Sequence, residues 1–276
     1  MNPKNNYTKK RFGQHWLTNQ NVLKEIIKIA ELSKKDCILE IGPGRGALTS
    51  KLLELDILKL HAVELDRDLI HFLNERFLGI EKFSLQQEDI LNIDLNSYDF
   101  KFTKIIANIP YNITSPIIDK FVGRLGKVPV YNLEKIVFLM QKDVADRIIA
   151  KEGDKEVGAI STRIKLISKV YKICDVSPSS FSPPPKVYSS LVVFQPFHKN
   201  LRLNIDLEKY IDKILKVAFN GRRKKLKNTL STLFTKEEFK NIEFISKVDF
   251  EKRPQDISIE NWIRIAESCN KIENSK

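Results

Sequence analysis

The chain has 276 residues, which at about 150 residues per domain corresponds to one large domain or two modest ones. Its 47 Lys and Arg residues exceed its 35 Asp and Glu residues, so the formal net charge is +12 at pH 7. A hydrophobic content of 42% argues against a disordered chain, and no apolar run is long enough to cross a membrane. These values predict a soluble, folded, basic protein whose expected partner is a polyanion, most often nucleic acid.

The cysteines and histidines exclude two kinds of site. Cys37, Cys174 and Cys269 are odd in number and far apart, and no Cys or His pair has metal-ligand spacing. The first residues are basic but lack the apolar core of a secretory signal. We therefore expect reduced cysteines, no metal and a cytoplasmic location.

Strand and helix patterns alternate along the first 198 residues. This alternation predicts a parallel sheet with helices on both faces. Ser177–Pro185 is rich in serine and proline and is expected to be extended rather than helical. In chain order the sequence predicts strands at 37–41, 59–65, 83–87, 104–107, 135–140, 170–176 and 187–194, and helices at 47–55, 67–77, 115–124 and 143–149.

After Pro196 the pattern becomes helical. One apolar stripe runs through 226–234 and another through 262–269, with Ser258 as the expected N-cap of the second helix. These observations predict a domain of residues 1–198, with a basic arm at 1–17, and a helical domain of residues 199–276. The second holds 18 basic and 12 acidic residues, a net charge of +6, which is half of the total excess.

The first chemical motif is the glycine-rich turn Glu40–Gly46, which follows the first strand of the alternating region. Glycines at 42, 44 and 46 tolerate positive φ and let the backbone pass close to a ligand. Glu64 follows 22 residues after Gly42, where a carboxylate can accept the two hydroxyls of a ribose. This spacing predicts a cofactor that contains a nucleoside. By itself it does not distinguish a nicotinamide cofactor from S-adenosylmethionine. The alternative is that the glycine turn is purely structural. Glu40 either contacts the cofactor or caps the following helix.

A second motif favours S-adenosylmethionine over a nicotinamide cofactor. Asp89 ends the third strand, where its carboxylate can accept the exocyclic amine of an adenine. Asn108-Ile-Pro-Tyr111 ends the fourth and resembles the Asn-x-Pro-Tyr motif of enzymes that methylate adenine N6. Asn108 and the Ile109 carbonyl can accept the N6 hydrogens, and the ring of Tyr111 can stack on an extruded base at about 1–3 kcal/mol. The alternative is a structural turn with a core tyrosine.

An ordered set of motifs extends this resemblance over nearly the whole chain. It resembles the ribosomal RNA small-subunit adenine dimethyltransferase family. The resemblance rests on segments 10–17, 40–49, 64–68, 108–113, 141–142, 181–187, 218–225 and 253–254.

This family resemblance implies an α/β fold of the class I methyltransferase (Rossmann-like) type, with a mostly parallel seven-stranded sheet, one antiparallel strand and a small all-helical C-terminal domain. It also implies transfer of methyl groups from S-adenosylmethionine, with S-adenosylhomocysteine as product. The acceptors would be two adjacent adenosines in a hairpin near the 3′ end of small-subunit (16S) rRNA. The expected partner is this rRNA within a pre-30S particle during ribosome biogenesis, and the expected state is a monomer.

The resemblance also transfers site residues. In the family, Asn also occurs at the position of His15, and Phe is common at the position of Trp16. The alternatives are that His15 is a plain loop residue and that Phe181 is a core residue. The implied base-handling residues are Asn108, Tyr111 and Phe181. The implied cofactor contacts are His15, Leu17, Gly42, Glu64, Asp89 and Asn108.

A basic run in the C-terminal part is the predicted RNA contact. Beside an apolar helical stripe, its cations would form a phosphate-binding face, and a solvated helix surface is the alternative. The run comprises Arg222, Arg223, Lys224, Lys225 and Lys227.

Three other functions compete with this assignment. They are a 23S rRNA adenine N6-methyltransferase of the antibiotic-resistance type, a non-catalytic ribosome-assembly or nucleic-acid-binding factor on the same fold, and a nicotinamide dehydrogenase. Segments 181–187 and 218–225 favour the small-subunit enzyme over the first. The intact Glu64, Asp89, Asn108 and Tyr111 favour retained chemistry over the second.

Overall fold

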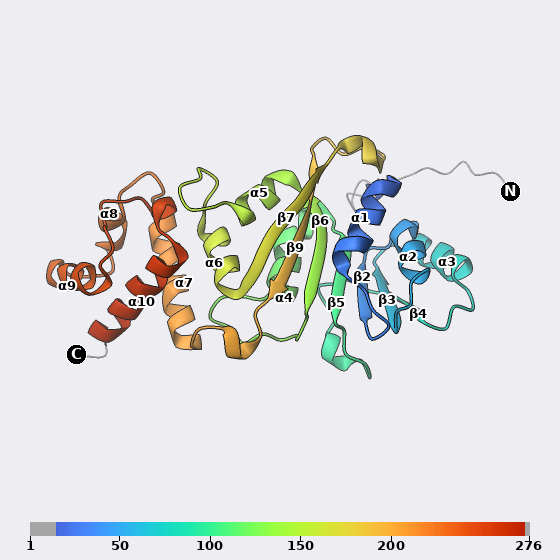
Figure 1. The fold of residues 1–276 in the computed structure, drawn as a ribbon, viewed down its shortest axis with the longest axis horizontal. Helices are drawn as coiled ribbons and strands as arrows, with labels where there is room; N and C mark the ends of the chain where they lie inside the picture. Colours follow the sequence, from blue (N-terminus) through green and yellow to red (C-terminus); the bar gives the residue numbers. More distant parts are fainter. Residues whose placement is uncertain (1–14, 274–276) are drawn as a thin grey trace. The chain divides into compact units, whose positions relative to one another are not determined.

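The computed structural model describes residues 15–273, and its contacts divide the chain into two compact units (Figure 1). Unit 1 contains the chain up to Val122 together with Val130–Ala145 and Tyr171–Pro196. Unit 2 contains the intervening segments and everything from Phe197 onward. The predicted boundary between two domains at residue 198 stays a prediction. Most of the predicted basic arm, residues 1–17, lies outside the described residues.

Unit 1 is built on a seven-stranded sheet with the order β4-β3-β2-β5-β6-β9-β7. Neighbouring strands from β4 to β6 are parallel, and β9 runs antiparallel to β6. This arrangement confirms the expected α/β class with a mostly parallel sheet and an antiparallel pair. The strands are β2 (Cys37–Ile41), β3 (Lys59–Glu64), β4 (Phe83–Gln87), β5 (Lys104–Asn108), β6 (Lys135–Gln141), β7 (Ser168–Val176) and β9 (Ser189–Pro196).

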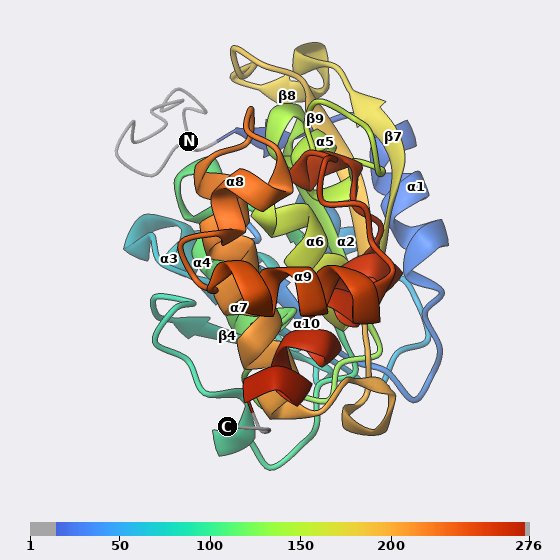
Figure 2. The same ribbon diagram turned by 90° about the vertical axis from the view of Figure 1, so that its left-hand side faces the viewer.

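The apolar character of the central strands explains why they are covered on both faces. Every residue of β2 is buried, as are all but the last residue of β6. Helices α1 and α2 pack together on one side of the sheet, and α4 lies on the other (Figures 1 and 2). The helices around the sheet are α1 (Gln20–Ala30), α2 (Ala47–Leu53), α3 (Arg67–Arg76), α4 (Thr114–Phe121) and α5 (Lys142–Ile149).

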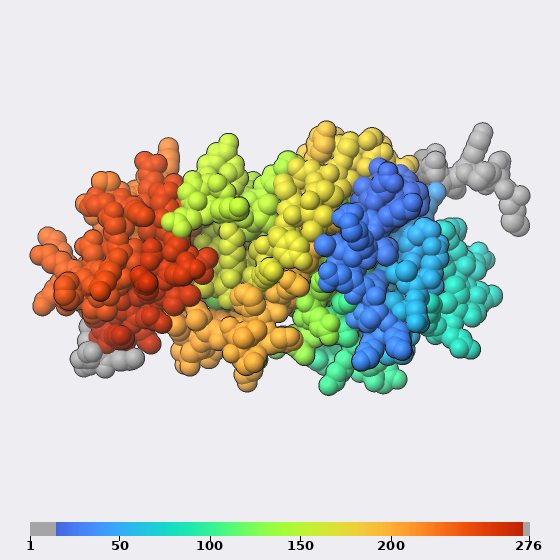
Figure 3. All heavy atoms as spheres, viewed as in Figure 1, coloured from blue at the N-terminus to red at the C-terminus, as the bar shows by residue number. Residues whose placement is uncertain are grey.

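Helix α1 is absent from the sequence-based prediction. The side chain of Asn19 caps it by accepting hydrogen bonds from the backbone N–H groups of Asn21 and Val22. Leu23 and Ile26 are buried on its inner face. In Figure 3 the blue α1 lies beside the yellow segment that includes β7, which joins distant parts of the sequence in one core.

The proline-rich segment differs in part from its prediction. Pro178–Ser180 forms a short 3-10 turn, because the Ser177 side chain accepts a hydrogen bond from the backbone N–H of Ser179. The next two residues form β8 (Phe181–Ser182), which pairs antiparallel with β1 (Trp16–Leu17). The segment is therefore extended only after its first turn, and it fixes the chain just before α1.

Unit 2 is helical in its C-terminal part, as predicted. The helix expected through residue 234 ends earlier, because Ser231 is already the C-cap of α8. Ser258 does cap the last helix: its Oγ accepts a hydrogen bond from the backbone N–H of Asn261, 3.1 Å away. The helices of this unit are α6 (Ala159–Ile167), α7 (Ile205–Asn220), α8 (Leu226–Leu230), α9 (Lys236–Ser246) and α10 (Ile259–Glu273).

The helices in the described part of the chain are all too short or too polar to span a bilayer.

Gly46, at the start of α2, should tolerate no side chain. Its φ is +76°, and a Cβ there would lie 2.7 Å from Phe77 Cε2. We expect Gly46→Ala to lower the free energy of unfolding by about 2–4 kcal/mol, since left-handed strain and overpacking add. Gly79→Ala is the matched control, because its φ is +78° but a Cβ meets no atom within 4 Å. Urea unfolding should show that Gly79→Ala lowers the free energy of unfolding by only about 1–2 kcal/mol. Equal losses in the two variants would contradict the packing argument.

Candidate functional site

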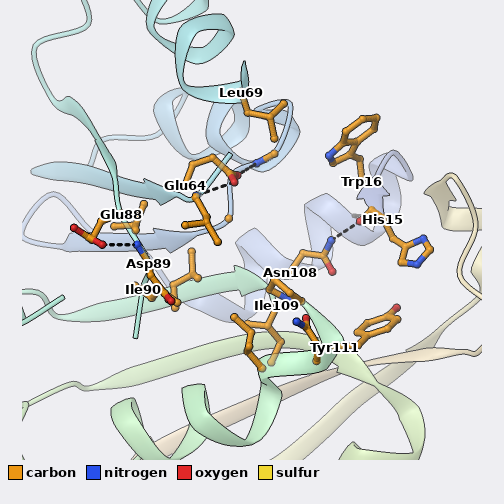
Figure 4. Close-up of a pocket in the computed structure, with 18 residues that line it drawn as sticks. His15, Trp16, Glu64, Leu69, Glu88, Asp89, Ile90, Asn108, Ile109 and Tyr111 are labelled. Atoms are coloured by element: carbon orange, nitrogen blue, oxygen red, sulfur yellow. Dashed lines mark hydrogen bonds between the residues drawn. The ribbon is translucent and has the colours of Figure 1, made fainter. Parts of the chain in front are cut away.

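A cavity of about 350 Å³ opens in unit 1 at the carboxyl ends of β2, β3 and β5 and beside the turn after β4 (Figure 4). Ligands of open α/β sheets bind at this edge. Glu64 and Asp89 lie on one side of the cavity, and Asn108 and Tyr111 lie on the other (Figure 4). The predicted site residues that line it are His15, Gly42, Glu64, Asp89, Asn108 and Tyr111.

The glycine turn leaves room for a ligand. Gly42 has a φ of +64°, and a Cβ built on it would meet no atom within 4 Å, although the residue borders the cavity. At Gly44 a Cβ would instead lie 2.8 Å from Trp16 Cδ1. The indole therefore packs directly on the turn, and it lines the cavity although the sequence analysis assigned it no role.

Glu64 is held by the backbone around it. Its Oε1 accepts hydrogen bonds from the N–H groups of Leu65 and Asp66 at 2.9 and 3.0 Å, and its Oε2 accepts one from Gly44 at 3.2 Å. Burial raises the pKa of this carboxyl, while these three donors act in the opposite direction. Because a carboxylate offers about four acceptor positions, about one remains, on Oε2, for a ligand hydroxyl.

Asp89 is oriented by the turn that follows β4. Its Oδ1 accepts a hydrogen bond from the backbone N–H of Leu91 at 2.9 Å, and its own N–H donates to Glu88 Oε1 at 2.8 Å. Ile90 and Leu69 add apolar surface to the same cavity. The sequence analysis missed both, although Ile90 directly follows the aspartate at the end of a strand.

The amide of Asn108 has a defined orientation. Its Nδ2 donates a hydrogen bond of 2.8 Å to the backbone carbonyl of His15. This bond assigns Nδ2 to the β1 side and leaves Oδ1 as an acceptor. The segment before α1 therefore orients Asn108, the residue that the sequence analysis expects to bind the target nitrogen.

Tyr111 is fixed at both its ring and its hydroxyl. The hydroxyl hydrogen-bonds Ser189 Oγ at 2.8 Å, and the ring stacks on His15 with centroids 5.8 Å apart and an interplanar angle of 27°. His15 Nδ1 in turn hydrogen-bonds the carbonyl of Pro183 at 2.9 Å. His15 is thus more than a plain loop residue, because it links β1, Asn108 and Tyr111.

Leu17 and Phe181 are not part of this cavity. They face each other in the β1–β8 pairing, and both are buried in the core of unit 1 with Val176 and Leu191. Phe181 is only 4% exposed. This burial agrees with the alternative that Phe181 is a core residue. The predicted stacking of Phe181 on a base stays a prediction, and this geometry does not support it.

A smaller cavity of about 170 Å³ adjoins the glycine turn and is lined by Leu17, Glu40 and Asn108, among others. Glu40 is 1% exposed, and its Oε2 has no hydrogen-bond partner among the described residues. Burial, together with the nearby Glu64, raises the pKa of Glu40 to about 8, while the polar groups of Thr49 act in the opposite direction. Glu40 lies near Thr49 in the first turn of α2, but Thr49 Oγ1 also lacks a hydrogen-bond partner among the described residues, so the helix-capping alternative for Glu40 stays a prediction.

The basic run lies in unit 2 and differs from its predicted placement. Four of its cations lie in the turn before α8 rather than on a helix face, because α8 begins only at Leu226. Arg222 donates a hydrogen bond to the backbone carbonyl of Lys155. Lys225 and Lys227 form ion pairs with Glu251.

The residues that line the two cavities of unit 1 fit the predicted cofactor, S-adenosylmethionine. The free acceptor position of Glu64 suits a ribose hydroxyl, the space above Gly42 admits a ligand, and the orphaned Oε2 of Glu40 suits an ammonium group. The cavity volume lies within the usual range for small-molecule sites. Within residues 15–273 no three His, Cys, Asp or Glu side chains gather as a metal-ligand set, and the absence of a metal stays a prediction.

Known proteins resemble this chain over nearly its full length. A family model described as ribosomal RNA adenine dimethylase matches residues 5–271. Ribosomal RNA small subunit methyltransferase A of Prochlorococcus marinus strain MIT 9301 is 62% identical over 273 residues, covering 99% of this chain and 100% of the relative. The protein of the same name from strain MIT 9211 is 45% identical over 266 residues, with 96% and 94% covered.

Solved structures agree with the fold. A dimethyladenosine transferase from Plasmodium falciparum is 29% identical with a TM-score of 0.76, covering 93% of this chain and 98% of that one. The 23S rRNA methyltransferase ErmE has a TM-score of 0.74 over 92% of this chain and 99% of its own, but at 20% identity it supports the fold alone. By its match to the family model and to these relatives, the chain belongs to the ribosomal RNA adenine dimethylase family.

Proposed function

We propose that this chain transfers methyl groups from S-adenosylmethionine to N6 of two adjacent adenosines, in a hairpin near the 3′ end of small-subunit rRNA. The observation that carries the proposal is Asn108, whose amide is fixed by the His15 carbonyl beside the stacked Tyr111 in the cavity. The names of the relatives support the small subunit as the substrate. The proposal includes a pre-30S particle as the setting, a monomeric enzyme and a cytoplasmic location.

The cofactor end of the cavity would be formed by Glu64, Asp89 and Gly42. Glu64 would accept a ribose hydroxyl, and Asp89 would accept the exocyclic amine of the cofactor adenine. When bound, S-adenosylmethionine supplies a methyl group on a sulfonium, which is already a good leaving group. The chain itself therefore has to bind and orient two reactants, not to activate a leaving group.

The other end would bind the target base. Asn108 Oδ1 and the Ile109 carbonyl would accept the two N6 hydrogens, which favours a more pyramidal and more nucleophilic nitrogen. The ring of Tyr111, held by Ser189 and His15, would stack on the extruded adenine. Stacking worth about 1–3 kcal/mol offsets a comparable cost of unstacking the base.

Orientation accounts for the rate in this scheme. Holding N6 in line with the methyl group can contribute roughly 7–11 kcal/mol. The methylated nitrogen is cationic and acidic, so it can lose its proton to water without a dedicated base. The second methylation needs the monomethylated base in the site again, with one N–H fewer to donate to Asn108 and Ile109.

The proposal is tested by incubating the protein with labelled S-adenosylmethionine and unmethylated small subunits, large subunits or naked rRNA. We expect N6,N6-dimethyladenosine at two adjacent positions of the small-subunit rRNA. Label confined to large-subunit RNA would instead support the antibiotic-resistance type of enzyme. RNA binding without label in any sample would support a non-catalytic factor.

The basic run should supply sequence-independent affinity for RNA. We expect Arg222→Ala with Arg223→Ala to weaken rRNA binding and to reduce the slope of log affinity against log salt by about 0.7–0.9 for each phosphate that is no longer neutralised. Lys236→Ala with Lys240→Ala is the control, because it removes two exposed cations of α9 from the same unit. Filter binding between 50 and 300 mM salt measures both slopes. Slopes that match in the two double variants would mean that the run is an ordinary solvated surface.

A further inference from the structure

The basic run consists of two kinds of cation. The side chains of Arg223 and Lys224 make no ion pair within the described part of the chain, whereas Lys225 and Lys227 share one acidic partner. Lys225 Nζ lies 2.7 Å from Glu251 Oε2, and Lys227 Nζ contacts Oε1 of the same carboxylate. Each carboxylate oxygen is therefore occupied by one ammonium group.

The backbone holds this arrangement in place. The N–H groups of Leu226 and Lys227 donate to the carbonyls of Lys252 and Phe250 at 2.8 and 3.0 Å. The N–H of Glu251 itself donates to Asp249 Oδ1 at 2.8 Å. The two lysines and the glutamate are thus brought together by main-chain bonds on either side of them, not only by their flexible side chains.

All three side chains remain accessible to a ligand. Their exposed fractions are 52% for Lys225, 43% for Lys227 and 49% for Glu251. The two ammonium groups together lower the pKa of Glu251, so the carboxylate is charged at neutral pH. Exposed ion pairs of this kind contribute little to folding stability. The cluster is therefore free to exchange its anion without a large cost to the fold.

A phosphate presents the same two-oxygen edge as a carboxylate and binds the same ammonium groups. Building on the proposed RNA-binding function, we propose that Lys225 and Lys227 form a phosphate site for RNA in which Glu251 holds the phosphate position in the free protein and is displaced on binding. Glu251 is then an internal competitor. It lowers the affinity of this site for RNA in general, so that only RNA which also makes the base and cation contacts elsewhere displaces it.

The test compares Glu251→Gln with Glu237→Gln, which removes the same charge from the exposed first turn of α9, where Glu237 has no ion pair among residues 15–273. We expect Glu251→Gln to tighten binding of small-subunit rRNA about three- to tenfold, because one charge adjacent to the phosphate is lost. The control should change affinity by less than about twofold, since its charge is screened. Thermal unfolding of each variant checks that the fold is unchanged.

A second background makes the result specific. In a chain that carries Lys225→Ala and Lys227→Ala, the additional change Glu251→Gln should no longer tighten binding beyond the control. Equal affinities of the Glu251 and Glu237 variants would overturn the inference, and weaker binding by Glu251→Gln would show that the carboxylate organises the lysines for RNA instead of competing. If the unmodified chain methylates small-subunit rRNA while the two Gln variants bind alike, this inference alone fails. A chain that binds no rRNA would overturn the proposed function together with it.

Discussion

Asn108→Ala should reduce methyl transfer by at least about 10²–10³-fold while leaving rRNA affinity within about twofold. The first figure is typical for the loss of one positioned hydrogen-bonding group at a reacting centre. The variant removes the Oδ1 acceptor from the cavity. It also removes the Nδ2 donor that binds the His15 carbonyl. Single-turnover methylation with saturating RNA measures the first quantity, and filter binding measures the second.

A loss of methyl transfer without a loss of rRNA affinity would identify Asn108 as a residue that acts on the target base. Asn108 is part of unit 1, and the basic residues expected to bind phosphate belong to unit 2. Affinity for a large RNA should therefore survive the loss of one amide. Gln86→Ala is a matched control for stability. Gln86 is on β4, its amide oxygen accepts a hydrogen bond from the Tyr98 hydroxyl, and it does not border the cavity. A parallel loss of affinity and rate in Asn108→Ala would mean that the amide holds the chain together at β1 instead of holding N6.

The sequence predicted the sheet well because its strands are short, apolar and bounded by turns. Cys37–Ile41 and Phe83–Gln87 have the predicted bounds. Strands β3, β5 and β6 differ by one residue at one end, β7 begins two residues earlier, and β9 is shifted by two residues at both ends. Helix α1 was missed although Leu23, Ile26 and Ala30 have helical spacing and Asn19 precedes them as a cap. The helix expected through Phe234 stops at Leu230, since an apolar stripe can continue through a turn.

The site was predictable wherever a residue ends a strand. Glu64 and Asn108 end β3 and β5, and Asp89 lies two residues after the end of β4, so all three lie where the carboxyl ends of parallel strands meet. Contacts made by tertiary pairing were not predictable in this way. The β1–β8 pairing places the His15 carbonyl against Asn108 and places Phe181 in the core, and neither result has a local signal in the sequence. The same holds for Glu251, which lies 24 residues or more from the lysines that it binds.

Glu40→Gln should make the ligand-free protein progressively more stable than the unmodified chain as the pH rises from 5 to 8. Burial raises the pKa of Glu40 from 4.5 to about 8, so the folded chain keeps this proton while the unfolded chain has released it. Within that window folding takes up a proton, and rising pH therefore opposes folding by up to about 1.4 kcal/mol per pH unit. The amide of Gln is neutral at every pH and removes this dependence.

Urea unfolding of both chains at pH 5.5, 6.5, 7.5 and 8.5 measures the difference directly, and all other titrating groups cancel in it. Parallel stability curves would show that Glu40 is already ionised in the folded chain. Calorimetry then tests whether this carboxyl contacts the cofactor. If the ammonium group of S-adenosylmethionine lies beside the orphaned Oε2, binding at pH 6.5 should release a proton, because a cation favours the ionised form. If Glu40 makes no contact with the cofactor, the binding enthalpy should be the same in buffers of different ionisation enthalpy. Glu40→Gln should then bind the cofactor as tightly as the unmodified chain does.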